Sequence, residues 1–593
     1  MNTTQSQRAV HMDVEPDAVF GHLHMPPDTP LATAVLIVPP WGWDAVVSYR
    51  SVRAWAEHLA DAGHATLRFD LPGTGDSGGG PRDDARLDAW VAAITAAADW
   101  LREQSGCSRI ATIGLGLGGL LCGKAIAQGS QIDDLVLWAA PVRGRAFVRE
   151  QRAFSELQAS RMTLTGEPEP SNLPEGWLEA GGFVLSAETV SALQNVDLRT
   201  LQLGGLRRAL LLERDGMKVD ARLQASLEGA GVDVTTGPGD GWEAMVFDPE
   251  RPQPPEEVFA SVTSWLAQAP APVTTSRIRH PAAADEIVFE VEGARVRESS
   301  LTVQHSRARL NGVLTEPADR AAADMCAVFL NAGAVRRIGP NRMWVEASRR
   351  WAARGVAAFR VDLEAIGDAD GDANRYRDVT KFYVPEFVEQ VGLVLDTLED
   401  RGLGERFMLT GLCSGGYWAF QAALRDARVS AVLLLNGGAL VWDDDLVTRR
   451  DGSKVARLRQ LVWWRKILRG EVSLVRMSAV ARAYMRGEIM RLVRSPTIVR
   501  DSPVETNIGL GLDRLCNTRT KLVLAFSGDE ALHAELQEEG ILARLERWPN
   551  VELVTLPGRD HTLRPIIAQR AVHELFDRVL ASDIARSTNH EAE

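Results

Sequence analysis

Short apolar runs alternate with longer amphipathic stretches along most of the chain. The first clear unit opens with AVLIVPPWG at 34–42 and reaches HATLRFD at 64–70, with an amphipathic stretch between the two. A continuous apolar run that ends at Pro or Gly predicts a buried strand, and apolar residues recurring every three or four positions predict a helix. Strands that alternate with helices at this spacing indicate an α/β class with a mainly parallel sheet covered on both faces.

This strand–helix–strand unit is present twice. Residues 326–371 contain CAVFLNAGA, a second helix-like stretch and then RGVAAFRVDLEAIGDADG. Asp70 and Asp76 of the first unit correspond to Asp362 and Asp368 of the second at one constant offset. In each copy a polar helix, a strand, a glycine-rich turn and a further strand follow. Such a repeat predicts two domains of one plan in tandem, which also suits a chain of 593 residues.

The boundary between the two domains is visible in the composition. Residues 269–285 are rich in Pro, Ala, Ser and Thr and have no apolar period, which is typical of a linker. The predicted domains are therefore 1–268 and 286–593. Each carries an insertion after the strand that follows its glycine turn, at about 141–206 and about 439–517. Both insertions are predicted to be largely helical and to cap a site at the edge of the sheet.

The glycine-rich turn differs between the copies at one central position. The first copy reads IGLGLGG with Gly116 at the centre, and the second reads TGLCSGG with Cys413 at the centre. Gly411 and Gly415, two residues before and after the cysteine, remove Cβ atoms that would clash in a tight bend. The helix that follows points its N-terminus at Cys413, and this favours a thiolate. Cys413 therefore lies at the apex of a predicted tight turn between a strand and a helix.

These turns and the segment LRFDLPGTGDSG at 67–78 resemble the α/β-hydrolase superfamily, and most of all its serine-aminopeptidase and thioesterase-like members. The resemblance implies two α/β-hydrolase folds in tandem, each a mainly parallel sheet flanked by helices with a helical cap insertion. It also implies a catalytic triad in the chain order nucleophile, acid and histidine. Cys413, Asp529 and His561 lie in that order, the last two after predicted strands. Glu530 is the alternative acid.

The same resemblance implies an oxyanion hole. Its two donors would be the backbone amide of Ser414 and an amide of the loop after the early strand, at Ala332 or Gly333. Three basic residues after this loop are candidates for binding a carboxylate or phosphate of the substrate, with an ordinary exposed helix start as the alternative interpretation. They are Arg336, Arg337 and Arg342.

The first copy lacks residues that the superfamily needs. Gly116 has no side chain to act as a nucleophile, and no histidine occurs between residues 65 and 279. The early loop VPPWG contains prolines, which have no amide hydrogen to donate. The first domain is therefore predicted to be catalytically inactive. Its turn also matches the pattern G-x-G-x-x-G of dinucleotide-binding domains, but no acidic residue ends the next strand, so the internal repeat is the favoured explanation of the glycines.

Charge is distributed unevenly along the chain. The net charge of −13 argues against general nucleic-acid binding. Residues 448–500 nevertheless hold fourteen Arg or Lys and only three acidic residues, with apolar residues at helical spacing between them. This basic insertion predicts an anionic partner, either coenzyme A or an acyl carrier protein that delivers an acyl thioester. An anionic membrane surface and a solvated helical face are the alternatives.

The start of the chain has no basic segment followed by an apolar core, so no signal peptide is predicted. Five scattered cysteines indicate a reducing compartment, and a cytoplasmic location is expected. No Cys or His spacing suits zinc, and no cofactor is predicted.

A cysteine nucleophile forms a thioester, which passes its acyl group readily to amines and thiols. The leading prediction is therefore an acyltransferase that uses Cys413, His561 and Asp529 to take an acyl group from a thioester donor. A hydrolase of esters, thioesters or lactones with the same residues is the second hypothesis. A non-catalytic scaffold in which both domains bind partners is the third.

Overall fold

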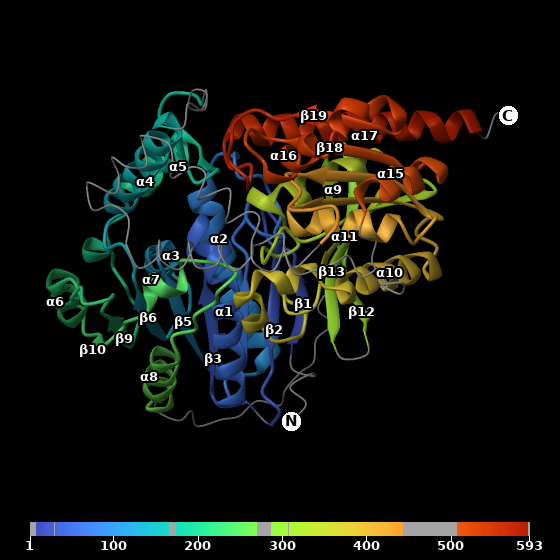
Figure 1. Cartoon of the computed structure of the whole chain (residues 1–593). Coiled ribbons are helices and arrows are strands. Elements are labelled where there is room, and N and C mark those ends of the chain that lie inside the picture. Colours follow the sequence, from blue (N-terminus) through green and yellow to red (C-terminus); the bar gives the residue numbers. More distant parts are fainter. Residues whose placement is uncertain are drawn as a thin grey trace, which may run out of the picture.

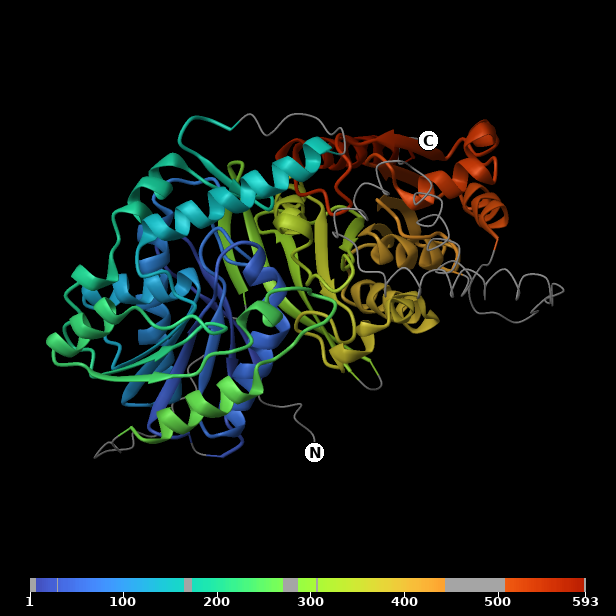
Figure 2. The ribbon, with the colours of Figure 1, turned by 60° about the vertical axis from the view of Figure 1, so that its left-hand side comes forward.

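The computed structural model of the chain contains two large β-sheets, one in each half, and the two halves lie next to one another (Figures 1 and 2). The structure describes residues 7–28, 30–164, 173–269, 286–305, 308–442 and 507–590. Nearly all of the predicted linker and most of the predicted basic insertion, at 270–285 and 443–506, lie outside the described residues. The expectations for those two segments therefore stay predictions.

The first sheet has eight strands in the order β1-β2-β4-β3-β5-β6-β9-β10. Its strands are β1 (Gln7–Met12), β2 (Val19–His24), β3 (Thr33–Val38), β4 (Thr66–Phe69), β5 (Arg109–Leu115), β6 (Asp134–Trp138), β9 (Arg208–Leu212) and β10 (Asp233–Gly237). The pairs β1–β2 and β2–β4 are antiparallel, and all later pairs are parallel. The central strands β3, β5 and β6 are buried along their whole length, because helices cover both faces of a parallel sheet.

Helices of the first half pack on both faces of its sheet. They are α1 (Trp43–Asp61), α2 (Arg86–Ser105), α3 (Leu117–Ala127), α6 (Ala221–Gly229), α7 (Trp242–Met245) and α8 (Glu256–Ala267). On one face Trp55 of α1 stacks on Phe259 of α8, with ring centroids 4.7 Å apart. On the other face Trp90 of α2 and Leu120 of α3 belong to a separate apolar core.

The insertion between β6 and β9 is partly helical. It contains α4 (Gly144–Leu164), the short strands β7 (Leu178–Ala180) and β8 (Phe183–Leu185), α5 (Ala187–Gln194) and the 3₁₀ helix η1 (Leu198–Thr200). The small antiparallel pair β7–β8 was not expected from the apolar pattern, since each strand has only three residues. Phe183 of this pair reaches the ring of Trp41 in the early loop, with centroids 6.0 Å apart.

The second sheet has nine strands in the order β11-β12-β13-β15-β14-β16-β17-β18-β19. They are β11 (Glu286–Val291), β12 (Ala294–Gln304), β13 (Arg309–Pro317), β14 (Met325–Phe329), β15 (Ala357–Asp362), β16 (Arg406–Leu412), β17 (Val429–Leu435), β18 (Lys521–Phe526) and β19 (Val551–Thr555). Apart from the added edge strand β11, this order repeats that of the first sheet. The pairs β11–β12, β12–β13 and β13–β15 are antiparallel, and the remaining pairs of the sheet are parallel.

Helices cover both faces of the second sheet as well. They are α9 (Met343–Ala353), α10 (Pro385–Asp400), α11 (Ser414–Ala423), α15 (Ile508–Asn517), α16 (Ala531–Glu538) and α17 (Ile566–His590). Phe387 of α10 stacks on Trp418 of α11 on one face, with ring centroids 4.8 Å apart. Trp351 of α9 packs against Phe576 of α17 on the other face.

At the interface between the halves, an arginine of each half pairs with an aspartate of the other, and the two pairs are equivalent in the repeat. Arg68 of β4 pairs with Asp368 at 2.6 Å, and Arg360 of β15 pairs with Asp76 at 3.3 Å. The two arginines correspond in the repeat, and so do the two aspartates. The same contact is thus made twice in opposite directions, as in the interface of a two-fold symmetric dimer. All four side chains are buried, so each charge depends on its partner across the interface.

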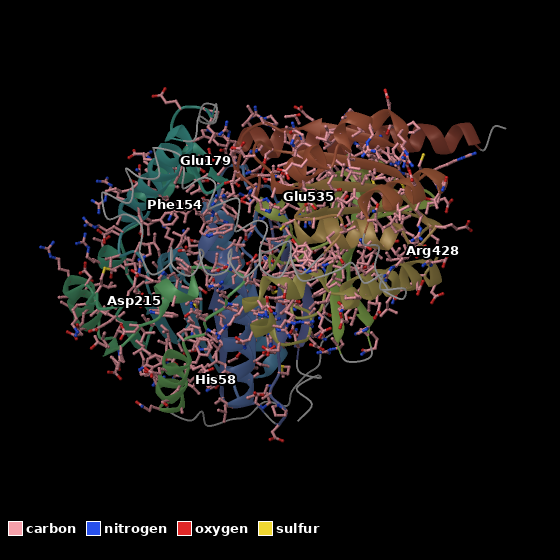
Figure 3. The ribbon with its side chains drawn as sticks, in the orientation of Figure 1. His58, Phe154, Glu179, Asp215, Arg428 and Glu535 are labelled. Atoms are coloured by element: carbon pink, nitrogen blue, oxygen red, sulfur yellow. The ribbon has the colours of Figure 1, made fainter. Side chains whose placement is uncertain are left out.

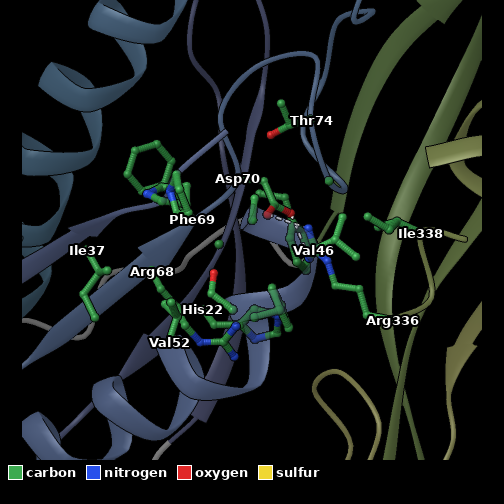
Figure 4. Close-up of a pocket in the computed structure, with 18 of the residues that line it drawn as sticks. His22, Ile37, Val46, Val52, Arg68, Phe69, Asp70, Thr74, Arg336 and Ile338 are labelled. Atoms are coloured by element: carbon green, nitrogen blue, oxygen red, sulfur yellow. Dashed lines mark hydrogen bonds and ion pairs between the residues drawn. The ribbon is translucent and has the colours of Figure 1, made fainter. Parts of the chain in front are cut away.

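The three arginines predicted to bind substrate belong to this interface instead, and that prediction is corrected. Arg336 pairs with Asp70 at 2.6 Å, and Figure 4 shows this pair at a cavity of about 60 Å³ between the halves. Arg337 pairs with Asp76 of the first half at 2.9 Å. Arg342 donates to the backbone oxygens of Gly75 and Ser77 of the first half. All three side chains are buried and bind groups of the protein itself, which favours a structural role over substrate binding.

Candidate active site

The turn around Cys413 has the geometry of a nucleophile turn. β16 ends one residue before Cys413, and α11 begins one residue after it. Cys413 has φ +56° and ψ −118°, a conformation that L-residues rarely adopt. A Cβ atom on Gly411 would lie 2.2 Å from the backbone of Gly415, and one on Gly415 would lie 2.2 Å from the carbonyl oxygen of Asn331. Only glycine fits at these two positions, and the bend exposes the cysteine side chain at its apex.

The acid that contacts the histidine is Glu530, not Asp529. The Nδ1 atom of His561 lies 2.9 Å from Oε2 of Glu530, whose side chain is buried. Asp529 has φ +66° in the turn after β18, and its side chain is 67% exposed and pairs with Arg559 at 3.1 Å. The prediction of Asp529 is therefore corrected to the alternative acid. The physical reason is that adjacent side chains in this tight turn point in different directions.

The imidazole of His561 links the acid to the nucleophile. Burial would lower its pKa, but hydrogen bonds with the Cys413 sulfur and with Glu530 outweigh burial and raise the pKa to about 10. An imidazolium at neutral pH stabilises a thiolate beside it.

The proposed oxyanion donors lie next to Cys413 in the chain or line the cavity that contains it. Ser414 is the first residue of α11, and amides in the first turn of a helix have no partner within the helix. Ala332 and Gly333 line the cavity that contains Cys413, and Gly333 has φ +55°. A carbonyl oxygen of a substrate held at Cys413 would thus lie close to the end of a helix and to this loop.

One further residue contacts the nucleophile. The hydroxyl of Tyr383, which ends the 3₁₀ helix η4 (Val379–Tyr383), lies 4.0 Å from the Cys413 sulfur. Its ring stacks on Trp442 with centroids 3.8 Å apart. No pattern in the sequence pointed to Tyr383, because no local spacing connects it with the glycine turn.

The cavity at Cys413 is built by both halves. It has a volume of about 290 Å³, and His561, Thr562 and Arg564 of the second half line it. The first half contributes five further residues. They are Trp43, Val46, Asp248, Pro249 and Glu250. Sequence reasoning missed these residues, because only the docking of the two halves brings them to the site.

The corresponding place in the first half is filled. Gly116 keeps the turn conformation with φ +50° and ψ −126°. A Cβ atom there would lie 3.1 Å from Pro40 and 3.5 Å from the ring of Trp242. Asp215 (labelled in Figure 3) accepts hydrogen bonds from the backbone amides of Gly241 and Glu243. The retained acid thus holds the loop that carries histidine in the second half, and little room remains for a nucleophile or a substrate.

Within the described ranges, no helix is long and apolar enough to cross a membrane.

Residues 46–173 match the sequence profile of the serine aminopeptidase, S33 family. This match lies in the half whose central turn residue is Gly116. A search of curated proteins gives no match to the chain.

Several solved structures are similar to just under half of the chain. Est1E from Butyrivibrio proteoclasticus with ferulic acid bound is 20% identical over 44% of this chain and 98% of its own, with a TM-score of 0.33. An esterase, Pf2001, from Pyrococcus furiosus is 17% identical over 45% and 92%, with a TM-score of 0.32. The esterase domain of a Rhodothermus marinus protein is 18% identical over 44% and 98%, with a TM-score of 0.31. Together with the profile match, the order of the strands and the glycine turns indicate an α/β-hydrolase-like fold.

Proposed function

We propose that the chain is a tandem of two α/β-hydrolase folds in which only the second is catalytic. The repeated strand order and the reciprocal contacts Arg68–Asp368 and Arg360–Asp76 support this proposal. The second half would be an acyltransferase that takes an acyl group from a thioester donor and holds it on Cys413. The observation that carries the proposal is the connected series of Cys413, His561 and Glu530, the first two of which line one cavity.

The proposed reaction has two stages. The Cys413 thiolate attacks the carbonyl carbon of the donor, and the amides of Ser414 and the loop at Ala332 and Gly333 stabilise the oxyanion. His561 gives its proton to the leaving thiolate, so the donor leaves as a thiol and an acyl-cysteine remains. In the second stage an acceptor loses a proton to His561 and attacks the acyl-cysteine, and the C–S bond breaks. Glu530 keeps the imidazole oriented and stabilises its positive form throughout.

The donor is proposed to be a coenzyme A or acyl carrier protein thioester. The support is the basic composition of residues 448–500, which attracts an anionic carrier. That segment lies in the insertion that follows β17, the strand after the Cys413 turn.

A hydrolase with the same three residues is the second candidate. The profile match to serine aminopeptidases favours it, since those relatives are hydrolytic by name. In that case water replaces the acceptor in the second stage. The scaffold hypothesis, in contrast, requires that Cys413 never becomes acylated.

Intact-protein mass after incubation with a panel of acyl thioesters tests the proposal. We expect an adduct in the wild-type chain and none in Cys413→Ala. Cys516→Ala is the matched control, because Cys516 is also partly exposed but lies on α15, outside the cavity. Product analysis with and without an added acceptor then separates transfer from hydrolysis. Absence of an adduct with every donor, with Cys413 still alkylated normally, would favour the scaffold.

A further inference from the structure

The cavity that holds Cys413 also holds a carboxylate from the inactive half. Glu250 lies in the segment between α7 and α8 and lines this cavity together with Asp248 and Pro249. One of its oxygens lies near the proposed oxyanion loop, because a Cβ atom built on Gly333 would lie 3.3 Å from Oε1 of Glu250. Glu250 therefore borders the space in which an acyl-cysteine would meet its acceptor.

The Glu250 carboxylate forms no hydrogen bond or ion pair in the part of the chain that the structure describes. The carboxylate of Asp248 accepts a hydrogen bond from the backbone amide of Glu250, and it forms an ion pair with Arg251 at 3.8 Å. Arg564, a cation that lines the same cavity, is paired with Asp560. Burial raises the pKa of Glu250 and the charge of Asp248 raises it further, outweighing the opposite effects of Arg251 and His561, neither of which forms an ion pair with it. A half-buried carboxylate without a partner is costly, so a ligand that supplies a cation would be favoured.

A carboxylate beside the oxyanion loop also opposes the proposed reaction. Negative charge develops on the carbonyl oxygen during attack at the acyl carbon, and a like charge nearby destabilises it. A cation held by Glu250 removes that repulsion. The ammonium group of an amine is such a cation, and its nitrogen becomes a nucleophile for a thioester once it has lost a proton.

We propose that Glu250 binds the ammonium group of a primary amine and that this amine is the acyl acceptor, which rests on the proposed acyl transfer by Cys413. Glu250 takes one proton from the ammonium, and the neutral nitrogen attacks the carbonyl carbon of the acyl-cysteine. His561, neutral after protonating the donor's thiolate, takes a second N–H proton as the C–N bond forms. The C–S bond breaks, the amide and the Cys413 thiolate are released, and the proton on Glu250 passes to solvent. The inactive half would thus supply the acceptor site of the active half.

Competition between matched acceptors tests this site. Cys413 is loaded from an acyl thioester, and butylamine or butanol is added to the wild-type chain and to Glu250→Gln. We expect the ratio of amide to free acid to fall about tenfold or more in Glu250→Gln, because a hydrogen bond between opposite charges is lost. The ratio of ester to free acid should change much less, because butanol is uncharged. Glu243→Gln, an exposed carboxylate of the same half, is the matched control and should behave as wild type.

A binding measurement distinguishes this inference from the chemistry on which it rests. Butylammonium should slow the alkylation of Cys413 by iodoacetamide in the wild-type chain and not in Glu250→Gln. Equal protection in both proteins, or an equal amide-to-acid ratio, would overturn the acceptor site even though acyl-cysteine forms. If no thioester acylates Cys413, the proposed transfer fails, whereas loss of protection in Glu250→Gln would still support an ammonium site.

Discussion

Cys413 keeps a backbone conformation that costs energy for any residue with a side chain. Gly116, its counterpart in the first half, has nearly the same φ and ψ and tolerates them without Cβ strain. Strained residues persist where the surrounding structure holds them, and they are frequent at active sites. The contrast between Gly116 and Cys413 therefore supports a chemical role for the cysteine, because glycine would be the easier residue in this bend.

The imidazole of His561 has a raised pKa that can be measured. Its pKa is raised to about 10, against the lowering effect of burial, by Cys413 and Glu530. We expect the wild-type imidazole to stay protonated throughout the neutral range and to lose its proton only as the pH approaches that value. In Cys413→Ala one of the two stabilising partners is missing, so the imidazole should lose its proton at a lower pH, by about one unit or more. NMR titration of the ring nitrogens measures both values.

Cys516→Ala again serves as the control for that titration. An imidazole that titrates identically in the wild-type chain and in Cys413→Ala would contradict the proposed pair of thiolate and imidazolium.

At the scale of elements, the turn between β18 and α16 decides which acid contacts His561. β18 ends at Phe526, and Asp529 takes a left-handed conformation before Glu530 caps α16. The pattern of residues 520–533 predicted this strand and the acid after it. The pattern did not show which of the two adjacent acids contacts His561. That choice depends on the backbone angles of the turn and on the position of His561 in space.

The two acids form a matched pair for mutagenesis. We expect Glu530→Gln to slow acyl-cysteine formation by about 100-fold or more, because the imidazole loses the carboxylate that orients it and stabilises its positive form. Asp529→Asn should change the rate little, since its side chain is exposed and faces Arg559. The rate is measured by quenched-flow mass spectrometry of the acyl-enzyme. The opposite ranking of the two variants would restore Asp529 as the triad acid.

At the scale of the whole molecule, buried charges join the halves. Arg360 has no exposed surface and contacts Glu298 at 3.0 Å and Asp76 at 3.3 Å. Burial would raise the pKa of Glu298, but Arg349 and Arg360 outweigh it and hold the pKa below its usual range. The carboxylates therefore stay ionised at neutral pH only while the arginines remain in place. The first half is thus bound to the second half by charges that neither half can expose to solvent without a loss of stability.

Removing one of these charges tests that conclusion. We expect Arg360→Met to lower the free energy of unfolding by about 3–5 kcal/mol, because two buried carboxylates lose a partner. Arg354→Met is the matched control, since Arg354 is 37% exposed and its surface pair with Asp577 should contribute about 1 kcal/mol or less. Urea denaturation followed by tryptophan fluorescence measures both variants. Equal stability of the two would show that the interface does not depend on its buried charges.

The sequence by itself determined the local features of this protein. Apolar runs and glycines set the strands and the tight bend at Cys413, because these depend on the chemistry of neighbouring residues along the chain. Tertiary structure decided the rest. In the folded protein Arg336 pairs with Asp70, and Glu530 contacts His561. Glu250 of the first half lines the cavity that contains Cys413. Contacts between residues hundreds of positions apart follow from the docking of whole sheets, and no local period encodes them.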